Sequence, residues 1–189
     1  MDIREEINNR IQWEKASKAG IVLGLVSSAY LLLSSLLARY AGNINSAFLV
    51  TFISMALWSV KFLACIGLMK YFLIRLKITY KGVDSNVAFK FGVKIALLSA
   101  FVYSVFYLAN LLYISNDVLQ AQMDLFLEQA APMMDSNTAA VMDKTMDSLP
   151  TSTTIFNLIY CTLFGTVLSK VLSKALIPDK DFTDDEETK

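Results

Sequence analysis

The sequence contains no histidine, two cysteines and three prolines in its 189 residues. Without histidine, histidine-dependent acid–base catalysis is excluded and a common metal ligand is missing. The two cysteines, Cys65 and Cys161, lie inside apolar segments, which is typical of small buried side chains and not of a disulfide framework or a zinc site. The interiors of the long apolar runs also lack carboxylates, which disfavours proton-coupled export of cations.

An excess of positive charge is absent too, since 17 basic residues balance 17 acidic ones. Nucleic acid is therefore not expected as a partner, because phosphate binding relies on a clear surplus of lysine and arginine. What the chain does have is apolar residues, at 55% of the sequence and a mean hydropathy of +0.48. Collected in blocks, they predict a protein whose main partner is membrane lipid.

Four apolar runs are each about long enough to cross a bilayer, and they predict spans at 19–38, 47–69, 91–113 and 153–176. The expected fold class is therefore all-α, an integral membrane four-helix bundle within a domain covering residues 19–177. We expect the first span to be uncleaved, because both the apolar run and its charged lead-in are too long for a signal peptide.

Charge is distributed unevenly between the segments that connect the spans. The connector from Lys70 to Lys94 carries six basic residues against one acid, Asp84. Residues 115–150 carry six acidic residues and a single basic one, Lys144. The positive-inside rule then predicts that the connector and both chain termini are cytoplasmic and that residues 115–150 are external.

The connector also carries local signals for the chain path between the second and third spans. Lys81-Gly82 predicts a turn. A helix is expected to resume at about Asn86, with Asp84 or Ser85 as its N-cap.

Three segments outside the spans have their own patterns. Residues 1–18 predict a short amphipathic helix on the cytoplasmic membrane surface, with Trp13 at the headgroup level, and residues 178–189 form an acidic, solvated cytoplasmic tail. In residues 115–150, apolar side chains recur at helical spacing and predict two amphipathic external helices, the second at 138–148. Their apolar positions are Leu119, Met123, Phe126, Leu127, Ala130 and Met134, followed by Val141, Met142 and Met146. This methionine-rich surface is a candidate for binding a protein partner, and packing on lipid or helix ends is the alternative.

Small residues form a stripe along one face of the first span. Gly20, Gly24 and Ser28 are four residues apart, so they lie on the same face of a helix. Such a stripe predicts close approach of another helix, either from the same chain or from a second copy in a homo-oligomer.

Lys61 is the one ionisable residue in the interior of a predicted span. Two interpretations stay open: its ammonium reaches the headgroups past Trp58, or it points into the bundle as a cation that binds an anionic group. The candidate intramembrane polar site consists of Lys61, Asn110 and Asn157, with Tyr103, Tyr107 and Tyr160 as further polar neighbours.

Two sequence stretches resemble a known family. They are VAFKFGVKIALLSAFVYSVFYL before and within the third span, and LEQAAPMMDSNTAAVMDKTMDSLP ahead of the fourth. Over residues 15–175 the chain resembles a bacterial family of small four-helix membrane proteins catalogued as domain of unknown function 4199. The resemblance implies four spans and a bacterial inner membrane, and it implies no catalytic or binding residues.

No motif in the sequence indicates an enzyme. A nucleotide-binding loop, a GxSxG elbow, an HExxH helix, a CxxC pair and a calcium loop are all absent, so no catalytic residue, metal ligand or cofactor is predicted. We therefore predict a non-catalytic accessory, scaffold or assembly protein of the membrane. The alternative is a small oligomeric transporter or channel with Lys61 in its path.

Overall fold

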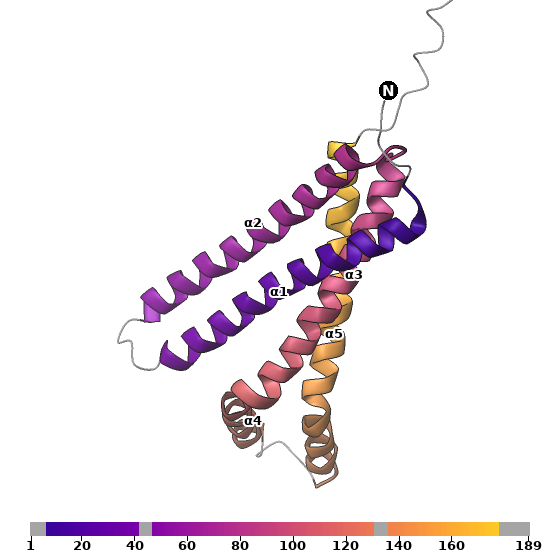
Figure 1. Cartoon of the computed structure of the whole chain (residues 1–189). Helices are drawn as coiled ribbons and strands as arrows, with labels where there is room; N and C mark the ends of the chain where they lie inside the picture. The colour runs from indigo at the N-terminus through magenta and orange to yellow at the C-terminus, as the bar shows by residue number, and fades with distance from the viewer. Residues whose placement is uncertain (1–6, 42–46, 131–135, 178–189) are drawn as a thin grey trace, which may run out of the picture.

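The computed structural model describes residues 7–41, 47–130 and 136–177, and all of its regular elements are helices (Figure 1). In chain order they are α1 (Asn9–Ala41), α2 (Ala47–Thr79), α3 (Ser85–Ala109), the π-helical turn η1 (Asn110–Ile114), α4 (Asn116–Ala130) and α5 (Ser136–Leu176). Within these described residues there is no strand, so the predicted all-α class is confirmed.

Four of these helices, α1, α2, α3 and α5, are long and apolar enough to cross a membrane. The segments that meet both conditions are Asn9–Leu37, Thr51–Thr79, Ser85–Ile114 and Ser148–Leu176. The prediction of four membrane-spanning helices is therefore supported in number and position, and the chain is a membrane protein.

The helices extend further than the apolar runs alone indicate. α1 already begins at Asn9, so the described part of the predicted surface helix over 1–18 is the first part of the spanning helix and not a separate element. The Asn8 side chain accepts a hydrogen bond from the Ile11 backbone N–H at 2.9 Å, which satisfies one of the free donors at the helix start. Lys18 and Glu14 form an ion pair one turn apart at 2.9 Å, which supports the same helix before the apolar run.

The second predicted external helix, at 138–148, is also not separate, because α5 runs without a break from Ser136 through Pro150 to Leu176. A proline inside a helix removes one backbone hydrogen bond and usually marks a boundary or a kink. Here the hydroxyls of Thr153 and Thr154 each donate to the carbonyl four residues earlier, at 2.7 Å. These bonds go to the carbonyls of Leu149 and Pro150, and not to the carbonyl four residues before Pro150 that loses its N–H partner. The helix nevertheless continues across the proline.

The connector from Lys70 to Lys94 is mostly helical, with only residues 80–84 between α2 and α3. The predicted turn contains Gly82, whose positive φ of 71° is a conformation that side chains with a Cβ atom rarely adopt. Asp84 is the N-cap of α3, and its carboxylate accepts the Val87 N–H at 2.7 Å. Both local signals in the connector are therefore confirmed.

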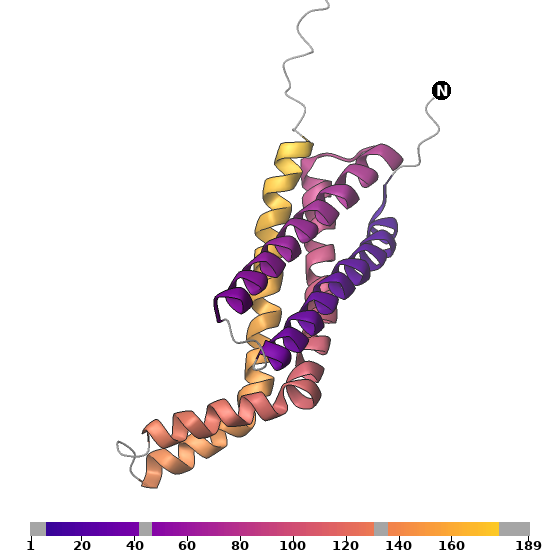
Figure 2. The same cartoon turned by 90° about the vertical axis from the view of Figure 1, so that its left-hand side faces the viewer.

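The buried core lies at the end of the bundle that carries the Lys81 turn, which we name the basic end. Met69, Leu73 and Leu76 of α2 pack there with Phe91 and Ile95 of α3. From this end the pair α1 and α2 diverges from the pair α3 and α5, as Figure 1 shows. Figure 2 shows α4 and the first part of α5 projecting sideways at the opposite end.

α3 is the central helix, and small residues bring its neighbours close to it. A Cβ atom at Gly20 or Gly24 of α1 would lie 2.7 Å from the Cβ of Leu98 or Val102. On the other side of α3, a Cβ at Gly165 of α5 would lie 2.6 Å from the Cβ of Ala96. The small-residue face of α1 is thus occupied by a helix of the same chain, and the alternative contact with a second copy is not needed to cover it.

Candidate polar site in the membrane interior

Lys61 projects from α2 toward two aromatic rings of neighbouring helices. Its Nζ lies 4.9 Å from the ring centre of Tyr30 in α1 and 4.7 Å from that of Tyr103 in α3. Both distances are within the range of a cation–π interaction. Trp58, past which the Lys61 side chain was expected to reach the headgroups, stacks on Phe62 with 5.6 Å between the ring centres. The structure thus places the ammonium against rings inside the bundle.

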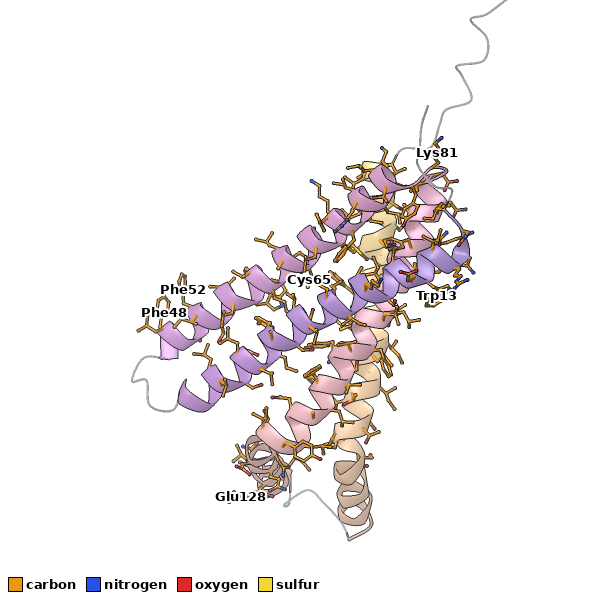
Figure 3. All side chains as sticks on the ribbon, in the orientation of Figure 1. Trp13, Phe48, Phe52, Cys65, Lys81 and Glu128 are labelled. Atoms are coloured by element: carbon orange, nitrogen blue, oxygen red, sulfur yellow. The ribbon has the colours of Figure 1, made fainter. Side chains whose placement is uncertain are left out.

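A cavity of about 180 Å³ adjoins this ammonium between α1, α2, α3 and α5. Its lining is mainly apolar and includes the polar side chains of Ser27, Lys61, Cys65, Ser99, Tyr103, Tyr160 and Cys161. The Ser27 hydroxyl and the Cys65 thiol are 3.5 Å apart, and Figure 3 shows Cys65 in the space between α1 and α2. The cavity therefore combines one fixed cation with hydroxyl and thiol groups.

Asn157 is joined to this cavity indirectly. Its Oδ1 accepts a hydrogen bond from the Cys161 thiol at 3.3 Å, and its side chain interacts with the Tyr103 hydroxyl. Asn157 does not line the cavity itself. It instead orients two side chains that do.

Asn110 lies elsewhere, at the start of η1, seven residues along from Tyr103 and therefore about 10 Å further along the helix. Its Nδ2 donates to the Ser115 hydroxyl at 3.2 Å, while its backbone carbonyl accepts the Ser115 N–H at 2.8 Å, five residues on. Among the predicted site residues, Lys61 and Asn157 are thus brought together through Tyr103, and Asn110 belongs to the π-helical turn.

Two buried oxygens near this turn, Asn110 Oδ1 and Ser104 Oγ, have no hydrogen-bond partner within the described part of the chain. A buried acceptor or hydroxyl without a partner costs free energy in an apolar environment. π-Helical turns, for their part, often occur at functional positions. Among the described residues, Asn110 Oδ1 and Ser104 Oγ are thus two separate unsatisfied oxygens, one in η1 and one in α3.

The small-residue positions contribute to packing and not to the cavity. Ser28 is buried, and its hydroxyl donates to the carbonyl of Gly24 at 2.8 Å. This bond satisfies the hydroxyl inside α1, so the stripe presents no free polar group to α3.

Three residues of this site were not predicted: Tyr30, whose ring contacts the Lys61 ammonium, and the cavity-lining cysteines Cys65 and Cys161. Tyr30 is the single tyrosine of the first apolar run, which by itself is only a weak indication of a role near Lys61. The cysteines were interpreted as ordinary buried side chains, and both are free thiols. In the described residues no three histidine, cysteine or acidic side chains converge as metal ligands.

The chemistry of this arrangement is that of anion or polar-group binding. The Lys61 ammonium has two cation–π partners, and no carboxylate pairs with it within the described residues. An uncompensated cation in an apolar region attracts anionic groups strongly, because the local dielectric constant is low.

Comparison of the chain with protein-family models, with curated proteins and with solved structures gives no match. The resemblance to the bacterial four-helix family therefore stays a prediction.

Proposed function

We propose that this chain is a non-catalytic accessory or assembly protein that works by binding a partner inside a bacterial inner membrane. In this proposal the basic end and both termini are cytoplasmic, and α4 with the first turns of α5 is external, as the charge distribution favours. The single observation that supports a binding role is the sparse packing of α2 against the rest of the chain.

Only 6% of the most apolar stretch of α2 is buried, against 28% for the corresponding stretches of α1 and α3. The stretch of α5 is also 6% buried, but α5 packs closely on α3, where a Cβ at Gly165 would lie 2.6 Å from the Cβ of Ala96. A Cβ at Gly67 of α2, by contrast, would have no atom within 4 Å. The outward side chains of α2 include several large aromatic and sulfur-containing ones, namely Phe48, Phe52, Met55 and Trp58. Helices in lipid associate mainly through van der Waals packing and hydrogen bonds between helices, since the hydrophobic effect does not drive them together. The end of α2 that carries Met69, Leu73 and Leu76 is buried in the core, but its other part is mostly exposed and can contact a partner helix.

Site-specific photo-crosslinking in native membranes tests this proposal. We expect a photoreactive residue at Phe52 or Met55 to give one discrete protein adduct, identified by mass spectrometry. The matched control positions are Leu97 and Phe101 of α3, which are also exposed and apolar but lie on a well-packed helix. These controls should capture lipid only, and lipid capture alone at the α2 positions would contradict the proposal.

A second candidate function rests on the Lys61 cavity. Lys61 between Tyr30 and Tyr103 would suit an anion path through an oligomer of this chain, because four spans alone rarely enclose a pore. The test is anion flux into proteoliposomes with chloride and inorganic phosphate as probes. Lys61→Leu should abolish the flux and Lys61→Arg should retain part of it. Equal flux in wild type, Lys61→Leu and empty liposomes would remove this candidate.

A further inference from the structure

A second cavity, of about 310 Å³, lies at the basic end between α1 and α2. Three cations line it: Lys15 and Lys18 of α1 and Arg75 of α2. All three side chains are exposed, so their charged groups are accessible from outside. The rest of the lining is mainly apolar and includes Ala19, Val22, Phe72, Leu76 and Phe91.

Positive charge exceeds negative charge around this cavity. Within the described residues, Glu14 is the carboxylate that pairs with one of the three cations, through the 2.9 Å contact with Lys18. Arg75 donates one guanidinium N–H to the Tyr71 hydroxyl at 3.1 Å, which leaves further donors on the same group. The site can therefore offer lysine ammonium and guanidinium donors to one anion.

The cavity also extends from the charged ends of the helices into their apolar segments. On α1 the lining changes from Lys15 and Lys18 to Ala19 and Val22, where the apolar run begins. On α2, Arg75 is followed toward the membrane interior by Phe72. A ligand that matches both parts needs an anionic head joined directly to an apolar chain.

We propose that this cavity binds an anionic glycerophospholipid, with its phosphate group between Lys15, Lys18 and Arg75 and an acyl chain along Val22 and Phe72. Arginine suits a phosphate because its planar fork can donate two parallel hydrogen bonds, and the lysines add positive charge. Basic pockets between spanning helices are known to take lipid head groups. Inorganic phosphate shares the charge but has nothing to place against the apolar wall. The proposal is independent of the partner proposed for α2.

Native mass spectrometry of the full chain released from nanodiscs tests this proposal. With phosphatidylglycerol in the nanodisc, we expect wild type to retain a bound lipid that phosphatidylcholine does not replace. Lys15→Gln combined with Arg75→Gln should lower the retained fraction about tenfold or more, because each cation near the surface contributes to anionic-lipid binding. The matched control, Lys90→Gln with Lys174→Gln, removes the same amount of charge at the same end of the protein but outside the cavity. It should change the retained fraction of lipid less than about twofold.

Val22→Trp provides a second variant, because it fills the apolar part of the cavity and keeps all three cations. It should lower phosphatidylglycerol retention as well. If circular dichroism shows that the charge variant is unfolded, Val22→Trp tests the proposal in its place. Retention unchanged in both variants would overturn the proposal. Displacement of the lipid by excess inorganic phosphate, with equal binding of phosphate to the lipid-free protein, would also overturn it and assign the site to free phosphate.

Discussion

Gly24 of α1 lies directly against Val102 of α3, and a Cβ atom at Gly24 would stand 2.7 Å from the Val102 Cβ. The same relationship holds one turn earlier, where a Cβ at Gly20 would lie 2.7 Å from the Leu98 Cβ. Real Cβ atoms do not approach one another so closely, so the distance between the two helices depends on the missing side chains. α1 and α3 therefore approach closely because glycine occupies both positions.

Gly24→Ala should lower the free energy of unfolding by about 1–3 kcal/mol, because the added methyl group forces α1 away from Val102. The measurement is reversible unfolding of the purified protein in mixed micelles. Gly67→Ala is the matched control, since no atom lies within 4 Å of the position that a Cβ at Gly67 would take. Equal destabilisation by both substitutions would show that the α1–α3 contact is not the cause.

Lys61 and Tyr103 should be energetically coupled, because the ammonium lies 4.7 Å from the ring centre. A double-mutant cycle with Lys61→Met and Tyr103→Leu should give a coupling free energy of about 0.5–2 kcal/mol. Tyr160 lines the same cavity without a cation–π contact to Lys61, so the cycle with Tyr160→Leu should give a coupling near zero. A Tyr103 coupling no larger than that of Tyr160 would refute the interaction.

Gly92 of α3 and Ser169 of α5 form a complementary pair. Ser169 is buried, and its hydroxyl donates to the Phe89 carbonyl at 3.1 Å, which places its side chain where a Cβ of residue 92 would be. Gly92→Ala should therefore destabilise the protein by about 1–3 kcal/mol through overpacking. Adding Ser169→Gly should restore part of that loss, although Ser169→Gly alone destabilises. Thermal unfolding of the three variants measures this, and an additive double variant would argue against direct contact.

Asp84 should stabilise the start of α3 through its bond to the Val87 N–H. Asp84→Ala should cost about 1 kcal/mol of unfolding free energy, the usual loss when an N-cap acceptor is removed. Asp84→Asn keeps a side-chain acceptor and should cost much less. Hydrogen exchange at the Val87 amide provides the local measurement, and similar exchange in wild type and Asp84→Ala would rule out the cap as the source of stability.

Local patterns account for the parts of this structure that the sequence predicted. Four apolar runs predicted four long helices because bilayer thickness sets their length, and the Asp84 cap depends on residues only three apart. The separate helix predicted at 138–148 was wrong, because a change from an amphipathic to an apolar pattern does not show that a helix ends, and α5 continues through Pro150. Apolar runs also do not show where a helix begins, because α1 takes in charged residues from Asn9 onward.

The partners of Lys61 could not be predicted in the same way. Tyr30 and Tyr103 come from two other helices, and which side chains meet depends on helix rotation and crossing angle. Composition indicated an unpaired cation among polar residues, yet Asn110 proved to bond with Ser115 in a π-helical turn. Such a turn changes the direction of the side chains that follow it, and the spacing of apolar residues in the sequence does not predict it.

Lys81 and Glu128 lie at opposite ends of the molecule, as Figure 3 shows, so a membrane crossed by the four helices should separate them. In a Cys65→Ala, Cys161→Ala background, we expect Lys81→Cys to react with an impermeant maleimide only in inverted vesicles. Glu128→Cys should react only in right-side-out cells, because the basic end is expected to stay cytoplasmic. Trp13→Cys is the control at the basic end and should follow Lys81→Cys. Labelling of positions 81 and 128 from the same face would mean that the helices between them do not cross the bilayer as proposed.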